Sequence, residues 1–226
     1  MFARISGRYD RLNTIMTAGR HYAWRRMAVE SATAGLTGPA LDVATGTGDF
    51  AVELARAPGV TAVVGIDFTL DMLTLAQEKA RKKRVDSRVA FLAGDAHALP
   101  FADNIFACAT VGFGVRNFID LPAALSELVR VVRPGGRIAV LEIVRPGSGP
   151  LGRLFPLYFR HVTPWLGAAF AGDRKAYTYL PESVSAFMTA AEVASLMEDA
   201  GLTHIASRRL ALSTVALLIG EKPITS

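Results

Sequence analysis

The alternation of short apolar runs with helical patterns between residues 39 and 143 constrains the fold of this chain most strongly. Such alternation is typical of strand-helix-strand units, in which parallel strands are covered by helices. We expect five strands in this section, at 40–44, 61–66, 89–92, 105–111 and 137–143. Helices are expected at 48–57, 69–84 and 121–132, the last of them ended by Pro134-Gly135-Gly136. The section therefore predicts an α/β fold built on a parallel sheet.

The segments on either side of this section are expected to complete the same domain. A helix over 191–200 and strands over 204–210 and 212–219 would extend the sheet. Residues 1–30 carry apolar side chains at steps of three and four, which predicts an N-terminal helical segment. Residues 144–181 are rich in glycine, proline and aromatic side chains and predict a partly helical insertion on the substrate side. We expect one domain over residues 1–226.

Composition excludes several classes of protein. The chain is 51% hydrophobic and 20% charged, which is too apolar for intrinsic disorder. Every apolar run is shorter than the 18 or so residues that a membrane-spanning helix needs, and the first ten residues do not resemble a secretion signal. A cytoplasmic protein is therefore expected. Cys108, the single cysteine, lies in an apolar run and predicts a reduced core thiol. Metal-ligand spacing is absent from the sequence, so no metal site is expected.

The formal net charge is +5, and the basic excess is concentrated in residues 1–28 and 145–175. These stretches suit weak contact with an anionic membrane surface, which would place the protein at the inner face of the membrane. They are not dense Lys/Arg blocks, and they carry no zinc-finger or RNA-reading motif, so no nucleic-acid partner is expected. The sequence leaves a homo-oligomer open.

A glycine loop follows the first expected strand. Thr45-Gly46-Thr47-Gly48 leads directly into a helix, where glycine permits a tight turn and exposes backbone N–H groups to a ligand. Asp67 ends the second expected strand about 20 residues later, where a ribose-binding acid belongs. These two features alone nearly match the dinucleotide-binding fingerprint, a carboxylate-bearing or phosphate-bearing cofactor would also fit, and the turn could be a structural connector.

A second acid separates these alternatives. Asp95, followed by Ala96, comes at the carboxyl end of the third expected strand, beside the crevice where open α/β sheets bind ligands. The arrangement resembles the class I S-adenosylmethionine-dependent methyltransferases. Two carboxylates suit the cationic sulfonium of that cofactor better than they would suit a pyrophosphate. That resemblance implies that the glycine loop meets the methionine portion, Asp67 the ribose, and Asp95 with Ala96 the adenine.

The resemblance sharpens to one family, the ubiquinone/menaquinone biosynthesis C-methyltransferases. Its most specific motifs are Arg8-Tyr9-Asp10-Arg11-Leu12-Asn13, Phe113-Gly114-Val115-Arg116-Asn117 and Tyr179-Leu180-Pro181-Glu182-Ser183. It implies a doubly wound, mainly parallel seven-stranded sheet, S-adenosylmethionine as cofactor and a prenylated hydroquinone as substrate. Gly112 stands where many members have a serine beside the cofactor. The implied cofactor-binding residues are Thr45, Gly46, Thr47, Gly48, Asp67, Asp95, Ala96 and Gly112.

The expected reaction indicates what a catalytic residue must do. A hydroquinone ring becomes nucleophilic enough for C-methylation when a hydroxyl ortho to the target carbon is deprotonated. An arginine such as Arg116 can hold the phenolate, and Asn117 can orient the ring or a water; the resemblance places both at the active site. His21, His97 and His161 could each act as a base, but packing or surface roles fit them better because no partner carboxylate is fixed by sequence spacing.

Two other functions stay open at this point. An NAD(P)-dependent oxidoreductase could use the same glycine loop, although it would leave Asp95 without a task. A repurposed member of the family could bind the cofactor and act on another small molecule. The sequence does not decide between menaquinone and ubiquinone precursors.

Overall fold

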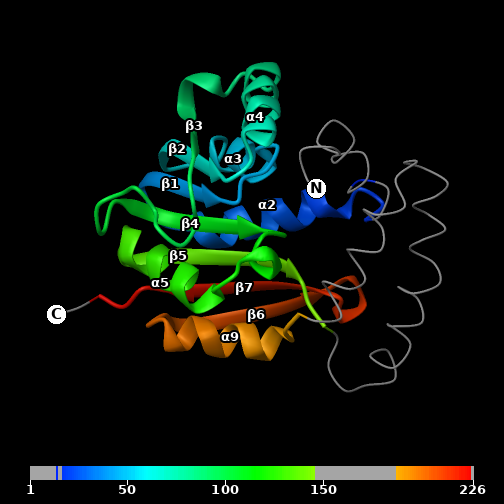
Figure 1. Ribbon diagram of the computed structural model, residues 1–226, viewed down its shortest axis with the longest axis vertical. Coiled ribbons are helices and arrows are strands. Elements are labelled where there is room, and N and C mark those ends of the chain that lie inside the picture. The colour runs from blue at the N-terminus through cyan, green and yellow to red at the C-terminus, as the bar shows by residue number, and fades with distance from the viewer. Residues whose placement is uncertain (1–13, 15–16, 146–186, 225–226) are drawn as a thin grey trace.

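Seven strands form one sheet in the computed structural model, which describes residues 14, 17–145 and 187–224 (Figure 1). The strands are β1 (Gly38–Val43), β2 (Val60–Asp67), β3 (Val89–Ala93), β4 (Phe106–Gly112), β5 (Val132–Ile143), β6 (Thr203–Leu210) and β7 (Val215–Glu221). Their order is β3-β2-β1-β4-β5-β7-β6. The first five pair in parallel, and β7 runs antiparallel to both β5 and β6. The predicted mainly parallel sheet is confirmed.

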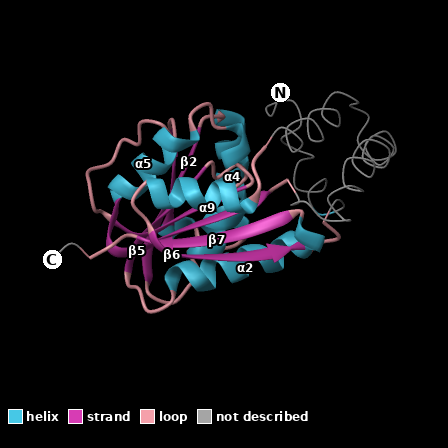
Figure 2. Cartoon of the chain, turned by 90° about the horizontal axis from the view of Figure 1, so that it is seen from below, coloured by secondary structure: helices cyan, strands magenta, loops and turns pink. Residues whose placement is uncertain are grey.

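Helices cover both faces of the sheet, which makes the fold doubly wound (Figure 2). The described helices are α2 (Arg20–Thr33), α3 (Asp49–Leu54), α4 (Leu70–Lys82), α5 (Leu121–Val131) and α9 (Ala190–Asp199). Side chains of α5 and α9 share one apolar core with the sheet, and side chains of α2 and α3 share the other. Alternate residues of β5 serve the two cores, Val140 the first and Leu141 the second, as expected for a strand buried on both faces.

Three predicted element boundaries are wrong. The helix predicted at 48–57 ends at Leu54, and two predicted strands begin at the wrong residue. β5 begins at Val132, directly after α5, so Pro134-Gly135-Gly136 lies inside the strand instead of separating it from the helix. The register with β4 shifts across this stretch and becomes regular at Arg137, because proline has no N–H to donate and Gly135 has a φ of 73°. The predicted strand 212–219 starts three residues too early: β7 begins at Val215, and Leu212 has a φ of 55° inside the turn η4 (Ala211–Ser213).

Lys222 fixes the chain after β7. Its Nζ donates hydrogen bonds to the carbonyl oxygens of Val129 and Val132 at 2.7 and 2.8 Å and to Asn104 Oδ1 at 2.7 Å. Burial lowers the pKa of this ammonium group. Because the last carbonyls of a helix lack partners within the helix, the lysine both ends α5 and holds the chain against it.

The described helices include none that is long and apolar enough to span a bilayer. The amphipathic stripe predicted within residues 1–30 and almost all of the predicted insertion 144–181 lie outside the described residues. α2 covers the end of the N-terminal segment and continues to Thr33.

Candidate functional site

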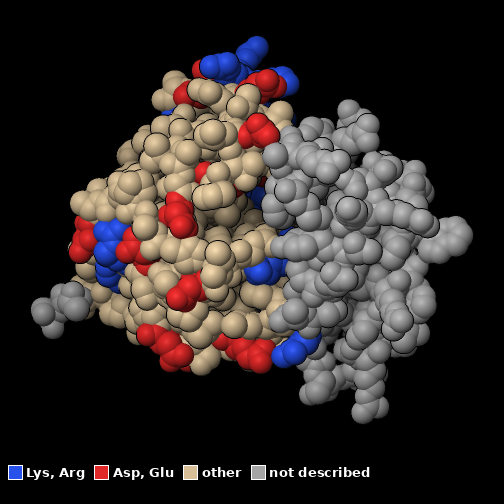
Figure 3. All heavy atoms as spheres, viewed as in Figure 1, with Lys and Arg blue, Asp and Glu red and all other residues tan. Residues whose placement is uncertain are grey.

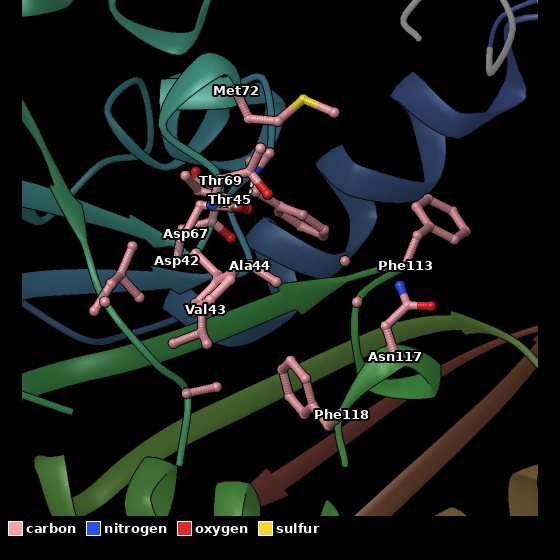
Figure 4. Close-up of a pocket in the computed structure, with 18 of the residues that line it drawn as sticks. Asp42, Val43, Ala44, Thr45, Asp67, Thr69, Met72, Phe113, Asn117 and Phe118 are labelled. Carbon is pink, nitrogen blue, oxygen red and sulfur yellow. Dashed lines mark hydrogen bonds between the residues drawn. The ribbon is translucent and has the colours of Figure 1, made fainter. Parts of the chain in front are cut away.

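A pocket of about 350 Å³ opens at the carboxyl ends of the parallel strands. It lies where the strand order reverses: the chain runs outward from β1 through β2 to β3 on one side and from β4 to β5 on the other. In open α/β sheets such a switch point leaves a crevice between the diverging connections, and ligands bind there. Figure 4 shows Asp42, Thr45 and Asp67 on one side of this pocket and Phe113 and Asn117 on the other.

The glycine loop between β1 and α3 forms the floor of the pocket. Gly46 and Gly48 have φ angles of 55° and 81°, in the region that favours glycine. The loop is tied to the end of β2, because Gly46 N donates to Asp67 Oδ2 at 2.8 Å and Thr69 N donates to Asp67 Oδ1 at 2.9 Å. Each oxygen of Asp67 keeps a further lone pair for a ligand. The carboxylate is therefore held in a fixed position at the edge of the pocket.

Asp42 is a buried carboxyl group below the same loop. Its Oδ2 accepts a hydrogen bond from Thr45 Oγ1 at 2.5 Å, and its Oδ1 accepts one from Thr110 Oγ1 at 2.8 Å. Burial raises the pKa of Asp42 to about 7, although the two hydroxyls and the charge of Arg25 oppose that change. The group can therefore change its charge near neutral pH, next to the ligand space.

Arg25 reaches the pocket from α2, and the sequence interpretation did not include it among the site residues. Its Nη2 lies 3.5 Å from Asp49 Oδ2, and Nη1 is hydrogen-bonded to the ring of His21. Lys79 Nζ donates to Asp49 Oδ1 at 2.6 Å and to Thr47 Oγ1 at 2.8 Å. Burial would raise the pKa of Asp49, but the charges of Arg25 and Lys79 outweigh it and lower the pKa. A charged network thus supports the start of α3.

His97 is paired with Asp95, a partner that sequence spacing alone does not indicate. The backbone N and ring Nδ1 of His97 contact Asp95 Oδ1 at 2.9 and 2.6 Å. Ring Nε2 accepts a hydrogen bond from Asp120 N at 3.2 Å, which leaves the proton of a neutral ring on Nδ1. The backbone and ring hydrogen bonds from His97 lower the pKa of Asp95. Asp95 therefore stays ionised and oriented at the rim of the pocket.

The structure separates Arg116 from Asn117, the two predicted catalytic residues. Both lie in the turn η3 (Val115–Asn117), and Asn117 lines the pocket. Arg116 is absent from the described residues that line it; its Nη1 donates to Glu142 Oε1 at 2.6 Å and to the carbonyl oxygen of Phe113 at 2.7 Å. The side chains of Arg116 and Glu142 are 5% and 0% exposed, so this is a buried ion pair behind the pocket wall.

Most of the predicted cofactor-binding residues surround the pocket. Those that line it are Thr45, Gly46, Thr47, Asp67, Asp95, Ala96 and Gly112. Gly48 belongs to the same loop but packs behind it, against Ala76 and Phe91. A side chain at Gly112 would overlap the ring of Phe50, so the ring takes the space that a serine would need.

The other residues singled out in the sequence lie away from the pocket or outside the described chain. Cys108 is buried, and burial raises the pKa of its thiol to about 12, which confirms the predicted core thiol. His21 is buried against Arg25, and His161 falls outside the described residues.

Comparison with known protein families gives a match over nearly the whole chain. The profile of the ubiE/COQ5 methyltransferase family matches residues 1–222. The demethylmenaquinone methyltransferase of Deinococcus radiodurans is 46% identical over 98% of this chain and 91% of its own length. That of Thermus thermophilus is 43% identical over 99% and 100%, respectively. The ubiquinone/menaquinone biosynthesis C-methyltransferase UbiE of Geobacter sulfurreducens is 39% identical over 98% and 87%.

Solved structures of lower identity share the fold. A SAM-dependent methyltransferase of Thermotoga maritima superposes with a TM-score of 0.66 at 21% identity and covers 98% of this chain and 97% of its own. The [4+2]-cyclase SpnF superposes with a TM-score of 0.64 at 20% identity, over 89% and 81%. Since a cyclase has the same architecture, the fold by itself does not establish the reaction.

Proposed function

The chain belongs to the ubiE/COQ5 methyltransferase family, and from this premise we propose that it transfers the methyl group of S-adenosylmethionine to a ring carbon of a prenylated hydroquinone. Demethylmenaquinol is the substrate that we favour, because the relatives at 46% and 43% identity are demethylmenaquinone methyltransferases. The observation that carries the proposal is Asp67, fixed by Gly46 N and Thr69 N at the end of β2 in a pocket that Asp95 also lines.

The lining residues fit S-adenosylmethionine, which supplies an electrophilic methyl group when bound. Asp67 can accept hydrogen bonds from two ribose hydroxyls because its oxygens are already oriented by backbone N–H groups. We assign Asp95, which His97 holds, to the adenine amino group. Asp42 adds a third carboxyl group beneath the loop, which suits a cationic ligand. An NAD(P) pyrophosphate would meet these acids unfavourably, and the family assignment does not favour that alternative.

Asn117 is our candidate for direct contact with the quinol. It lines the pocket next to Phe113 and Phe118, and its amide can donate to a phenolate oxygen or orient a water (Figure 4). Arg116 does not line the pocket and its charge is paired with Glu142, so we give it a positioning role in place of the predicted direct hold on the phenolate. Its pairing with Glu142 fixes the turn that carries Asn117. In this proposal Asn117 contacts the ring, and Arg116 positions Asn117.

Product analysis tests the proposed function. The protein is incubated with S-adenosylmethionine and a panel of reduced quinones, including demethylmenaquinol and its benzoquinol counterpart, and the products are analysed by mass spectrometry. We expect one added methyl carbon on the reduced substrate, none on the oxidised quinone, and greatly reduced product with Asp67→Ala. Cofactor binding without methylation of any reduced quinone would instead support a repurposed member of the family.

We also propose weak peripheral contact with the cytoplasmic face of a membrane, where a prenylated quinol resides. Support comes from the basic residues in 1–28 and 145–175 of the sequence. Basic side chains also gather over α4, at the top of Figure 3. Co-sedimentation with anionic vesicles should be measurable at low salt and lost at high salt, since each surface arginine contributes about 1 kcal/mol. Absence of protein from the low-salt pellet would refute this part of the proposal.

A further inference from the structure

Arg25 is a buried cation on the pocket wall that the assignments above leave without a ligand. The residue is 7% exposed. Its guanidinium carbon lies 5.7 Å from the centre of the Phe50 ring and 5.3 Å from that of Phe113. Aromatic rings stabilise the flat faces of a guanidinium but accept few of its hydrogen bonds. The edges of the group therefore decide what it can bind.

The described polar contacts of Arg25 leave donor capacity on those edges. A guanidinium has five N–H groups, and Nε of Arg25 has no hydrogen-bond acceptor among the described residues. The 3.5 Å between Nη2 and Asp49 Oδ2 is longer than a charge-assisted hydrogen bond, whereas Lys79 approaches the same carboxylate to 2.6 Å. Because an unsatisfied buried donor is costly, this guanidinium favours a further oxygen acceptor, and a ligand in the pocket that Arg25 lines could supply it.

The order of the strands places Arg25 at one end of the ligand space. Asp95 follows β3, Asp67 ends β2, the glycine loop follows β1, and Phe113 follows β4, so these groups are met in that order across the sheet. Arg25 lies beside Phe113, beyond the loop and at the end opposite to Asp67 and Asp95. In Figure 4, Asp67 and Phe113 stand on opposite sides of the pocket. The pocket thus has Asp67 and Asp95 at one end and Arg25, with its partner Asp49, at the other.

We propose that Arg25 binds the α-carboxylate of the methionine portion of S-adenosylmethionine. This inference rests on the proposed function, because the adenosine portion must occupy the end with Asp67 and Asp95 for the amino-acid portion to reach Arg25. Asp49, the partner of Arg25, is the first residue of α3 and directly follows the glycine loop, so the carboxylate would meet the guanidinium next to the loop N–H groups. The competing occupant is an anionic oxygen of the quinol.

Two ligands that differ in one group test the proposal. Decarboxylated S-adenosylmethionine keeps the adenosine, the sulfonium and the amine and lacks the carboxylate. Binding of both ligands to the full chain is measured by calorimetry without quinol, for the wild-type protein, Arg25→Met, Arg25→Lys and the neighbouring control Arg26→Met. Arg26 is exposed and pairs with Glu53 on the surface, so its replacement removes the same charge from α2 outside the pocket.

We expect Arg25→Met to weaken binding of S-adenosylmethionine roughly 10- to 100-fold and to leave binding of the decarboxylated ligand unchanged. Arg25→Lys should recover part of the loss, because it restores the charge without the planar fork. Arg26→Met should bind both ligands as the wild type does. Arg25→Lys carries the test by itself if Arg25→Met fails to fold in a thermal melt, with the same selective loss expected at smaller size.

Three outcomes would overturn the inference. Equal weakening of both ligands would show that Arg25 only maintains the loop, and unchanged affinity for both would show no contact. Unchanged cofactor affinity with a raised KM for the quinol would assign Arg25 to the substrate. A wild-type protein that binds neither ligand would instead overturn the proposed function itself, so the two failures are distinguishable.

Discussion

The two halves of the sheet are each built from strands covered by helices, but different side chains lie at the ends of their strands. In the half formed by β3, β2, β1 and β4, four polar residues are buried at or next to the carboxyl ends of the strands: Asp42, Thr45, Thr47 and Thr110. In the half that ends with β7 and β6, the buried side chains of β7 belong to Val215, Ala216, Leu217 and Leu218. The first half thus buries polar groups next to its strand ends, whereas the second half is packed with apolar side chains.

The difference follows from strand direction. Parallel strands bring all their carboxyl ends, and the loops that follow them, to one edge of the sheet, whereas β7 runs the other way and contributes its amino end there. We therefore expect substitutions in the first half to change binding and turnover, and substitutions in the second half to change stability alone. The buried pair of Arg116 with Glu142 on β5 lies at the boundary and should affect both.

Arg116→Ala should have the largest effect. It leaves Glu142 buried and unpaired, which should lower the free energy of unfolding by about 3–5 kcal/mol. Turnover should fall while cofactor affinity is retained, as checked by urea unfolding, initial rates and calorimetry. Arg145→Ala is the matched control, because its pair with Glu192 is half exposed and should contribute about 0–1 kcal/mol. Normal turnover in Arg116→Ala would show that Arg116 does not contribute to the reaction.

Leu218→Ala tests the second half alone. The side chain is fully buried in the core beside α5 and α9, so its truncation should cost about 2–5 kcal/mol of unfolding free energy. Cofactor affinity measured below the melting temperature should not change. Leu212→Ala, at a side chain that is 75% exposed, should alter neither quantity. A loss of affinity in Leu218→Ala would show that the two halves are coupled.

Asp42 makes the stability of the first half depend on pH. Its folded pKa of about 7 lies above the unfolded value near 3.8, so the folded protein holds the proton more tightly. The stabilisation is complete below about pH 4 and is lost as pH rises through about 7, by at most about 1.4 kcal/mol per pH unit. Unfolding of the wild type and of Asp42→Asn is compared from pH 5 to 8. The wild type should lose stability relative to the variant; parallel curves would contradict the pKa change.

Asp67→Ala should weaken cofactor binding by about 1.5–3 kcal/mol for each charged hydrogen bond lost, as measured by calorimetry. Asp67→Asn should lose less, because its amide oxygen still accepts a backbone hydrogen bond. Asp71→Ala, an exposed acid in the first turn of α4, is the control and should bind normally. Unchanged affinity in both Asp67 variants would place the ribose elsewhere.

The sequence predicts the first half of the molecule well because strand periodicity and glycine turns are local signals. The ends of β1, β2 and β3 follow from apolar runs, and Asp67 and Asp95 lie at the pocket as those ends require. At β5 the glycines mark the end of α5 correctly but do not show that the strand has already begun. Such signals locate an element more reliably than they locate its first residue.

These local signals do not indicate which side chains far apart in the sequence will pair. Arg25 lies in a helix before the first strand, and its place beside Phe50 and Phe113 is set by packing of α2 on the sheet. Glu142 lies in an apolar run that indicates a strand, and nothing in a two-residue period shows which cation a buried carboxylate will pair with. Both residues stand out in the sequence. Arg25 is a charged residue next to a tryptophan, and Glu142 is a charged residue inside an otherwise apolar strand.

The lysine clamp after β7 has a practical consequence for handling the protein. Because β7 runs antiparallel, the chain leaves the sheet at the edge away from the pocket, and Lys222 holds it there against the end of α5 (Figure 1). A tether or fusion partner attached beyond this point would start from a fixed anchor on the far side of the molecule. The protein could thus be immobilised by its C-terminal side on a sensor surface with the mouth of the pocket facing the solution.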